Sequence, residues 1–190
     1  RYLVAGRVGG LEPLIVLTKA DQADTQSAAQ LADLYRQLGF TVLVGNAKDA
    51  DFVEQVRAAI GGRVGALVGQ SGVGKSTLTR LLTGVDRAVG EVSEQIGGRH
   101  TTSDPRLIPM LGGGAVVDTA GVRGLFLPAL DADEVGDAYP EVRVHRADCR
   151  FRDCRHLSEP GCAVIAAAGR GALDPRRLAH FRALQQERDG

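Results

Sequence analysis

One stretch constrains the fold of this 190-residue chain more than any other, because Gly69-Gln70-Ser71-Gly72-Val73-Gly74-Lys75-Ser76 matches the pattern G-x-x-x-x-G-K-[ST] in full. The glycines let the backbone curl so that several N–H groups point at phosphate oxygens. We expect Lys75 to place its charge on the β- and γ-phosphates and the Ser76 hydroxyl to ligate Mg²⁺. The predicted nucleotide-binding set runs through this P-loop to Thr77.

A P-loop works between a buried strand and a helix, and the surrounding sequence predicts both. Continuous apolar runs at 14–17, 41–44 and 64–68 indicate buried strands. Helical spacing of apolar residues recurs over 28–38, 53–60 and 75–82, with glycines after each segment. Two further apolar runs, 106–110 and 115–118, flank three glycines and predict a hairpin. The alternation predicts an α/β fold with a mostly parallel sheet.

The character of the sequence changes after about Phe126, where strand patterns stop. We therefore predict two domains, residues 1–126 and 127–190. In the second, Pro160 is expected to open a short helix, and Asp174-Pro175 has the pattern of an N-cap and first helical residue.

A second motif bears on the choice of base. Thr18-Lys19-Ala20-Asp21 follows a predicted strand, where a guanine-specificity loop of the form Asn-Lys-x-Asp would lie. A carboxylate at Asp21 can accept hydrogen bonds from N1–H and the 2-amino group of guanine, which adenine does not offer there. The alternative is a solvated turn.

A third motif, Asp118-Thr119-Ala120-Gly121, has the form Asp-x-x-Gly that reaches Mg²⁺ through water and the γ-phosphate through the Gly121 N–H. Between it and the P-loop lies a polar loop, 97–102, in which Thr101 or Thr102 would ligate Mg²⁺ in the GTP state. The base loop precedes the P-loop, whereas in Ras-like GTPases it follows both phosphate motifs. This order predicts a circularly permuted GTPase.

All three cysteines lie within fourteen residues, in the pattern Cys149-x4-Cys154-x-His156-x5-Cys162. Three thiolates and one imidazole suit a closed tetrahedral Zn²⁺ site of structural type. The alternative is three free thiols beside a surface histidine. We predict one structural zinc in a small helical C-terminal domain, since that segment has few large apolar residues to form a core.

Charge narrows the possible partners. Twenty-three basic and 23 acidic residues give no net charge, which argues against a uniformly basic polyanion binder but permits a local basic patch. Five arginines crowd around the first cysteines, at 143, 146, 150, 152 and 155. They form either a solvated face or an RNA-phosphate contact. No long apolar stretch spans a membrane and none marks a signal peptide, so we expect a cytoplasmic protein. We also expect it to be a monomer.

The five motifs, in this order, resemble one family over essentially the whole chain: the circularly permuted small ribosomal subunit biogenesis GTPases, RsgA or YjeQ. The resemblance implies GTP hydrolysis stimulated by the small ribosomal subunit during late maturation, rRNA contact, and a zinc-binding helical C-terminal domain. It also implies that His100 orients the attacking water, because Val122 cannot, although His100 could instead touch RNA or solvent. The family's N-terminal OB-fold is expected to be absent here.

The sequence departs from the family at Thr18, where Asn is usual, and in the second base loop near 45–47. Two rivals remain open. One is an ATPase or small-molecule kinase with a zinc appendage, which nucleotide preference would separate. The other is a nucleotide-gated RNA-binding module whose hydrolysis is incidental, which subunit-stimulated turnover would separate.

Overall fold

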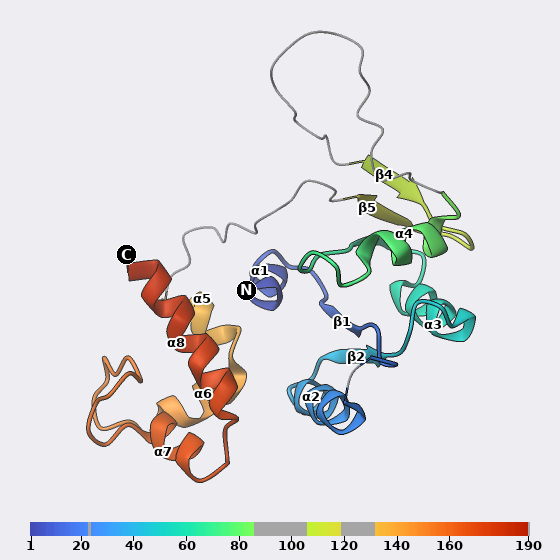
Figure 1. Cartoon of the computed structure of the whole chain (residues 1–190). Coiled ribbons are helices and arrows are strands. Elements are labelled where there is room, and N and C mark those ends of the chain that lie inside the picture. Colours follow the sequence, from blue (N-terminus) through green and yellow to red (C-terminus); the bar gives the residue numbers. More distant parts are fainter. Residues whose placement is uncertain (23, 86–105, 119–131, 190) are drawn as a thin grey trace, which may run out of the picture. The chain divides into compact units, whose positions relative to one another are not determined.

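The computed structural model of the chain describes residues 1–22, 24–85, 106–118 and 132–189 (Figure 1). The chain divides into two compact units, one formed by Leu14–Gly124 and the other by Arg1–Pro13 together with Leu125–Gly190. In the part of the chain that is described, no helix has the length and apolar character needed to cross a membrane.

The first of these units carries the strands, which form two small sheets. Strands β1 (Leu14–Leu17) and β2 (Thr41–Val44) pair in parallel. In the second sheet β5 (Ala115–Asp118) lies between β3 (Val64–Ala66), to which it is parallel, and β4 (Arg106–Pro109), to which it is antiparallel. The predicted hairpin and the mostly parallel α/β character are confirmed, but the strands are divided between two sheets in the described residues.

Three helices complete this unit: α2 (Thr25–Gln37), α3 (Ala50–Ile60) and α4 (Lys75–Thr83). Asp24 and Asp49 cap the first two by accepting backbone N–H bonds, as aspartates do at helix N-termini. One apolar core joins both sheets to these helices. Val16 and Leu43 of the first sheet and Val116 of the second pack around residues of α3 and α4, among them Phe52, Val56, Leu78 and Leu82.

The hairpin turn contains three glycines with positive φ, and Gly114 makes the closest contact of the three. Gly114 has φ +75°, and a Cβ there would lie 2.5 Å from the carbonyl oxygen of Arg63. The Gly114 carbonyl accepts a hydrogen bond from Met110 N–H at 3.0 Å. This close approach sets β5 against β3, so Asp118 lies at the same sheet edge at which β3 leads into the P-loop.

The other unit is helical, with α1 (Tyr2–Val8), α5 (Ala132–Asp137), α6 (Pro140–Arg146), α7 (Ala163–Gly169) and α8 (Pro175–Asp189). The sequence analysis grouped residues 1–126 together, but α1 packs in this unit. Val4 is 3% exposed within a core that includes Tyr139, Val142 and Phe181.

Local chemistry explains how the last helices begin. Pro160 does not open α7, which was the expectation. Instead Gly161 turns the chain with φ +74°, and Cys162 is the N-cap whose Sγ accepts a bond from Ile165 N–H at 3.5 Å. Helix α8 begins at Pro175 as expected, where the Asp174 carboxylate accepts the Arg176 N–H. The short helices α5 and α6 were not predicted.

Candidate nucleotide site and metal centre

The P-loop lies between β3 and α4. Gly74 is the N-cap of α4, with φ +96°, and it has no side chain that could cap the helix. The N–H groups of the first turn have no carbonyl partner within the helix and can therefore donate to a ligand. The Lys75 ammonium donates to the carbonyl oxygens of Gly69 and Gln70, each at 2.7 Å. These two bonds hold the Lys75 ammonium over the P-loop, close to the N-terminus of α4 and its free N–H groups. This arrangement suits a phosphate group.

The base-loop motif lies directly against the P-loop. The Thr18 hydroxyl donates to the Val73 carbonyl at 2.6 Å, and the Lys19 ammonium donates to the Gly72 carbonyl at 2.6 Å. Lys19 itself adopts φ +57°, a conformation that non-glycine residues rarely take. Two segments more than fifty residues apart in sequence therefore form one structure. The sequence analysis predicted both motifs but not these bonds.

A third loop supports the base loop. Gly45 N–H donates to the Leu17 carbonyl at 3.0 Å, and the Gly45 carbonyl accepts from Ala20 N–H at 3.1 Å. Glycine is required because a Cβ at this position would lie 2.2 Å from the Phe52 ring. The carboxylate-bearing residue of the motif, Asp21, is exposed. The base loop is therefore fixed by backbone bonds on one side and by the P-loop on the other.

The remaining predicted nucleotide contacts lie partly outside the described residues. Ser76 and Thr77 lie in the first turn of α4. Asp118 ends β5 at the P-loop edge of the sheet. His100, Thr101, Thr102 and Gly121 lie outside the described residues, so their predicted roles stay predictions.

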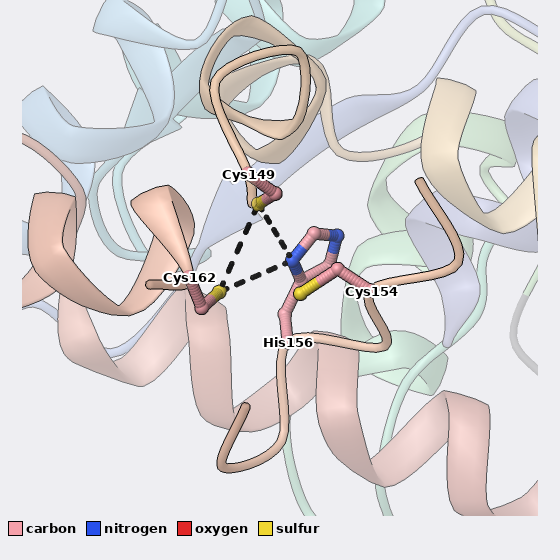
Figure 2. Close-up of side chains that lie close together, drawn as sticks. All are labelled: Cys149, Cys154, His156 and Cys162. Atoms are coloured by element: carbon pink, nitrogen blue, oxygen red, sulfur yellow. Dashed lines mark hydrogen bonds between the residues drawn. The ribbon is translucent and has the colours of Figure 1, made fainter. Parts of the chain in front are cut away.

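The four predicted metal ligands come together (Figure 2). The Cys149 and Cys162 sulfurs are 3.9 Å apart, and Nδ1 of His156 lies 3.6 Å from the first and 3.4 Å from the second. All four ligand atoms, Cys154 Sγ included, lie within 4.8 Å of one another. A tetrahedron with ordinary zinc bond lengths has edges of about 3.8 Å between sulfurs and about 3.5 Å between sulfur and nitrogen. The cluster could therefore hold a tetrahedral metal ion.

Two residues that were not predicted as functional shape the loop 147–162 between α6 and α7, called the metal loop below. Glu159 accepts backbone N–H bonds from Arg155 and Leu157 at 2.8 Å and from Ser158 at 3.0 Å. Burial alone would raise the pKa of this carboxyl, but the backbone donors outweigh it and lower the pKa to about 2. From α8, Arg182 donates to the carbonyls of His156 and Leu157 at 2.6 and 2.7 Å. No sequence signal pointed to either residue, because Glu159 follows a candidate ligand in an irregular loop and Arg182 lies on a helix distant in sequence.

Burial shifts the pKa values of two of the candidate ligands, His156 and Cys154, in opposite directions. The first shift favours the form that binds metal, and the second opposes it. Burial lowers the pKa of His156, and Arg146 and Arg182 lower it further against the opposing charge of Glu159, which favours the neutral imidazole that metal ligation requires. Burial raises the pKa of the Cys154 thiol to about 12. A cation at the centre is what would make that buried sulfur a thiolate.

Together, the strand–P-loop–helix unit and the base loop that precedes it define a circularly permuted P-loop GTPase fold, joined to a helical unit with a Cys3His cluster. The RsgA GTPase family profile matches residues 1–128. The chain belongs to the RsgA GTPase family.

Known relatives and solved structures support this family assignment. A protein of Azotobacter vinelandii named Small ribosomal subunit biogenesis GTPase RsgA is 43% identical over 187 residues, covering 96% of this chain and 54% of that protein. One of Haemophilus influenzae with the same name is 38% identical over 189 residues, covering 97% and 55%. The chain thus spans about half the length of the curated relatives it matches.

Two solved structures share the fold. YjeQ from Thermotoga maritima superposes with a TM-score of 0.75 at 26% identity, covering 100% of this chain and 64% of that one. YloQ, described as a circularly permuted GTPase, superposes with a TM-score of 0.76 at 27% identity, covering 99% and 61%.

Proposed function

We propose that this chain is a GTP hydrolase that acts in late maturation of the small ribosomal subunit, contacts its rRNA, and hydrolyses GTP faster when the subunit is bound. The observation that supports the nucleotide part is the bonding of Thr18 and Lys19 to P-loop carbonyls, because it holds the loop that we propose reads the base next to the loop that we propose binds phosphate. The relatives' name supports the ribosomal part.

In this proposal each motif has a separate role. Asp21 accepts the guanine N1–H and amino protons, and the Lys19 stem packs over the base plane. The P-loop N–H groups and Lys75 hold the phosphates. Lys75 leaves its carbonyl partners for the β- and γ-phosphates when nucleotide enters.

Hydrolysis needs Mg²⁺ bound with GTP, which neutralises charge on the phosphates. Ser76, Thr101 or Thr102, and Asp118 through water are the residues that would hold it. Gly121 donates its N–H to the γ-phosphate. His100 orients the attacking water, since the Val122 side chain forms no hydrogen bond to water. Loss of the γ-phosphate releases both loops, which distinguishes the GTP and GDP states.

The metal in the Cys3His cluster is Zn²⁺ in this proposal. Three sulfurs and one nitrogen are a ligand set that zinc prefers, and four protein ligands leave no open position for catalysis. Its role is to hold the loop between α6 and α7 in shape. The protein works in the cytoplasm, where it meets GTP and the small subunit, and it acts there as a monomer.

Calorimetric titration with GTP, GDP and ATP tests the nucleotide assignment. The parent chain should bind GTP and GDP and should bind ATP at least a hundredfold more weakly, because the Asp21 carboxylate finds no donors on adenine. Lys75→Ala should abolish binding, whereas Arg170→Ala, which removes an exposed cation in the helical unit, should not. Equal affinity for ATP and GTP would favour the ATPase or kinase alternative.

A further inference from the structure

The loop between the first two metal ligands carries an aromatic side chain that the core does not use. Phe151 is 40% exposed, whereas the other three phenylalanines that the structure describes, Phe40, Phe52 and Phe181, are at most 6% exposed. A large apolar ring left in solvent costs free energy. An exposed ring of this kind offers a flat face on which another planar group can stack.

This loop has a defined shape. Arg150 N–H donates to the Gly161 carbonyl at 3.1 Å, and Cys154 N–H donates to the Phe151 carbonyl at 3.3 Å. Cys149 and Cys154, which bracket the loop, both belong to the metal cluster (Figure 2). Phe151 is thus presented on a short segment fixed at both ends, so little conformational entropy is lost when it binds.

The surroundings of the ring are cationic. The guanidinium of Arg150 lies 5.4 Å from the ring centroid, within the range of a cation–π contact. Arg152 is exposed, and its side chain has no hydrogen-bond or ion-pair partner among the described residues. Over 143–155 the chain has five arginines against two aspartates. A flat ligand that also carries negative charge fits this patch.

We propose that Phe151 is a stacking platform for an unpaired RNA base, with Arg150 and Arg152 contacting the flanking phosphates. This inference rests on the proposed function and adds which part of the RNA is bound and by which residue. Base–aromatic stacking is sequence-tolerant and needs a base that is not enclosed in a duplex. An apolar protein surface would not use the arginines, so the charge of the patch favours RNA.

The experiment is fluorescence anisotropy with a short fluorescein-labelled RNA of mixed sequence, single-stranded or annealed to its complement, bound to the full zinc-loaded chain. Phe151→Ala should weaken single-strand binding roughly five- to hundredfold and leave duplex binding unchanged. Phe151→Tyr, which keeps the ring, should bind like the parent. Arg152→Gln should lower the salt dependence of single-strand binding by about 0.7 in the log–log slope.

Leu107→Ala is the control, because Leu107 is an apolar residue that is 61% exposed on β4, outside the 143–155 patch. It should bind both RNAs like the parent, and all variants should keep their zinc. Single-strand affinity of Phe151→Ala equal to that of the parent would overturn the proposal. So would equal losses for single strand and duplex, or intact RNA binding combined with lost subunit binding, which would assign Phe151 to a ribosomal protein.

The stacking site and the GTPase assignment can fail separately. If hydrolysis proved insensitive to small subunits while Phe151→Ala still lost single-strand binding, the proposed function would fail and the stacking site would stand. If hydrolysis were stimulated by subunits while Phe151→Ala bound RNA like the parent, the proposed function would stand and the stacking site would fail.

Discussion

The hydroxyl of Thr18 donates a 2.6 Å hydrogen bond to the carbonyl oxygen of Val73, 55 residues further along the chain. Thr18 belongs to the base loop, and Val73 lies between the two glycines that precede Lys75 in the P-loop. Circular permutation separates these loops in sequence order without separating them in space. The bond gives these two loops a common position, as the proposed engagement of one nucleotide by both would require.

Removing that hydroxyl should weaken nucleotide binding without unfolding the chain. We expect Thr18→Val to raise the Kd for GDP about fivefold, which corresponds to a net hydrogen-bond contribution of about 1 kcal/mol. Thr18→Ser should bind like the parent, because it keeps the donor. Thr41→Val makes the same change at an exposed strand position and should have no effect on Kd. Calorimetry gives all four values, and an unchanged Kd in Thr18→Val would exclude a positioning role for this bond.

Base selectivity should depend on Asp21. Asp21→Asn should weaken GTP binding and favour xanthosine triphosphate, whose ring has a carbonyl where guanine has the amino group. The amide donates to that carbonyl, whereas the carboxylate is repelled by it. Competition between the two nucleotides in parent and variant measures the change. An unaltered preference for GTP in the variant would remove Asp21 from base recognition.

The metal loop should depend on an ionised Glu159. Glu159→Gln replaces the acceptor of three backbone N–H groups by a weaker one, so zinc affinity at neutral pH should fall severalfold in competition with a chromophoric chelator. Asp153→Asn, at an exposed position of the same loop, should not change it. Elemental analysis of the parent should find about one zinc per chain. A disulfide between two of the cysteines, or no metal, would contradict the site.

The sign of the pH dependence follows from the lowered pKa of Glu159. A carboxyl whose pKa falls from 4.5 to about 2 on folding stabilises the folded state above pH 4.5, and this contribution is lost as the pH falls towards 2. The difference in unfolding free energy between parent and Glu159→Gln should therefore hold steady from neutral pH down to about 4.5 and shrink below it. Denaturant unfolding of the zinc-loaded proteins checks this, and a difference that grew on acidification would have the wrong sign.

The role of His100 is tested by separating binding from chemistry. His100→Ala should lower single-turnover GTP hydrolysis on the small subunit while leaving GTP affinity unchanged, because the imidazole positions water rather than nucleotide. Equal rates for parent and variant would leave the orienting group to be found on the ribosome.

Sequence patterns predicted the unit Leu14–Gly124 well, because its strands and turns are determined by residues close together in the sequence. The strands Leu14–Leu17 and Thr41–Val44 have the bounds that their apolar runs indicate, although they are partly rather than fully buried, and the three glycines after Met110 form the turn of the expected hairpin. The bonds from Thr18 and Lys19 to P-loop carbonyls could not be predicted, because they depend on which loops the sheet edge brings together.

The helical unit was harder to predict from the sequence, because its core depends on contacts between residues far apart in the chain. The cysteine spacing indicated the metal cluster, since ligand type and number are local. The burial of Val4 from α1 in a core built mainly of residues after 132 is a long-range contact with no local signature. Pro160 was misleading because Cys162, two positions later, is the N-cap that starts α7.

We propose that guanine nucleotide hydrolysis by this chain is coupled to the small ribosomal subunit. The most direct test is steady-state GTP hydrolysis with and without purified small subunits, with Lys75→Ala as the inactive control. We expect slow hydrolysis by the chain alone, a rate increase of at least tenfold on adding subunits, and no activity in Lys75→Ala. An equal rate with and without subunits, or faster hydrolysis of ATP than of GTP, would contradict this proposal.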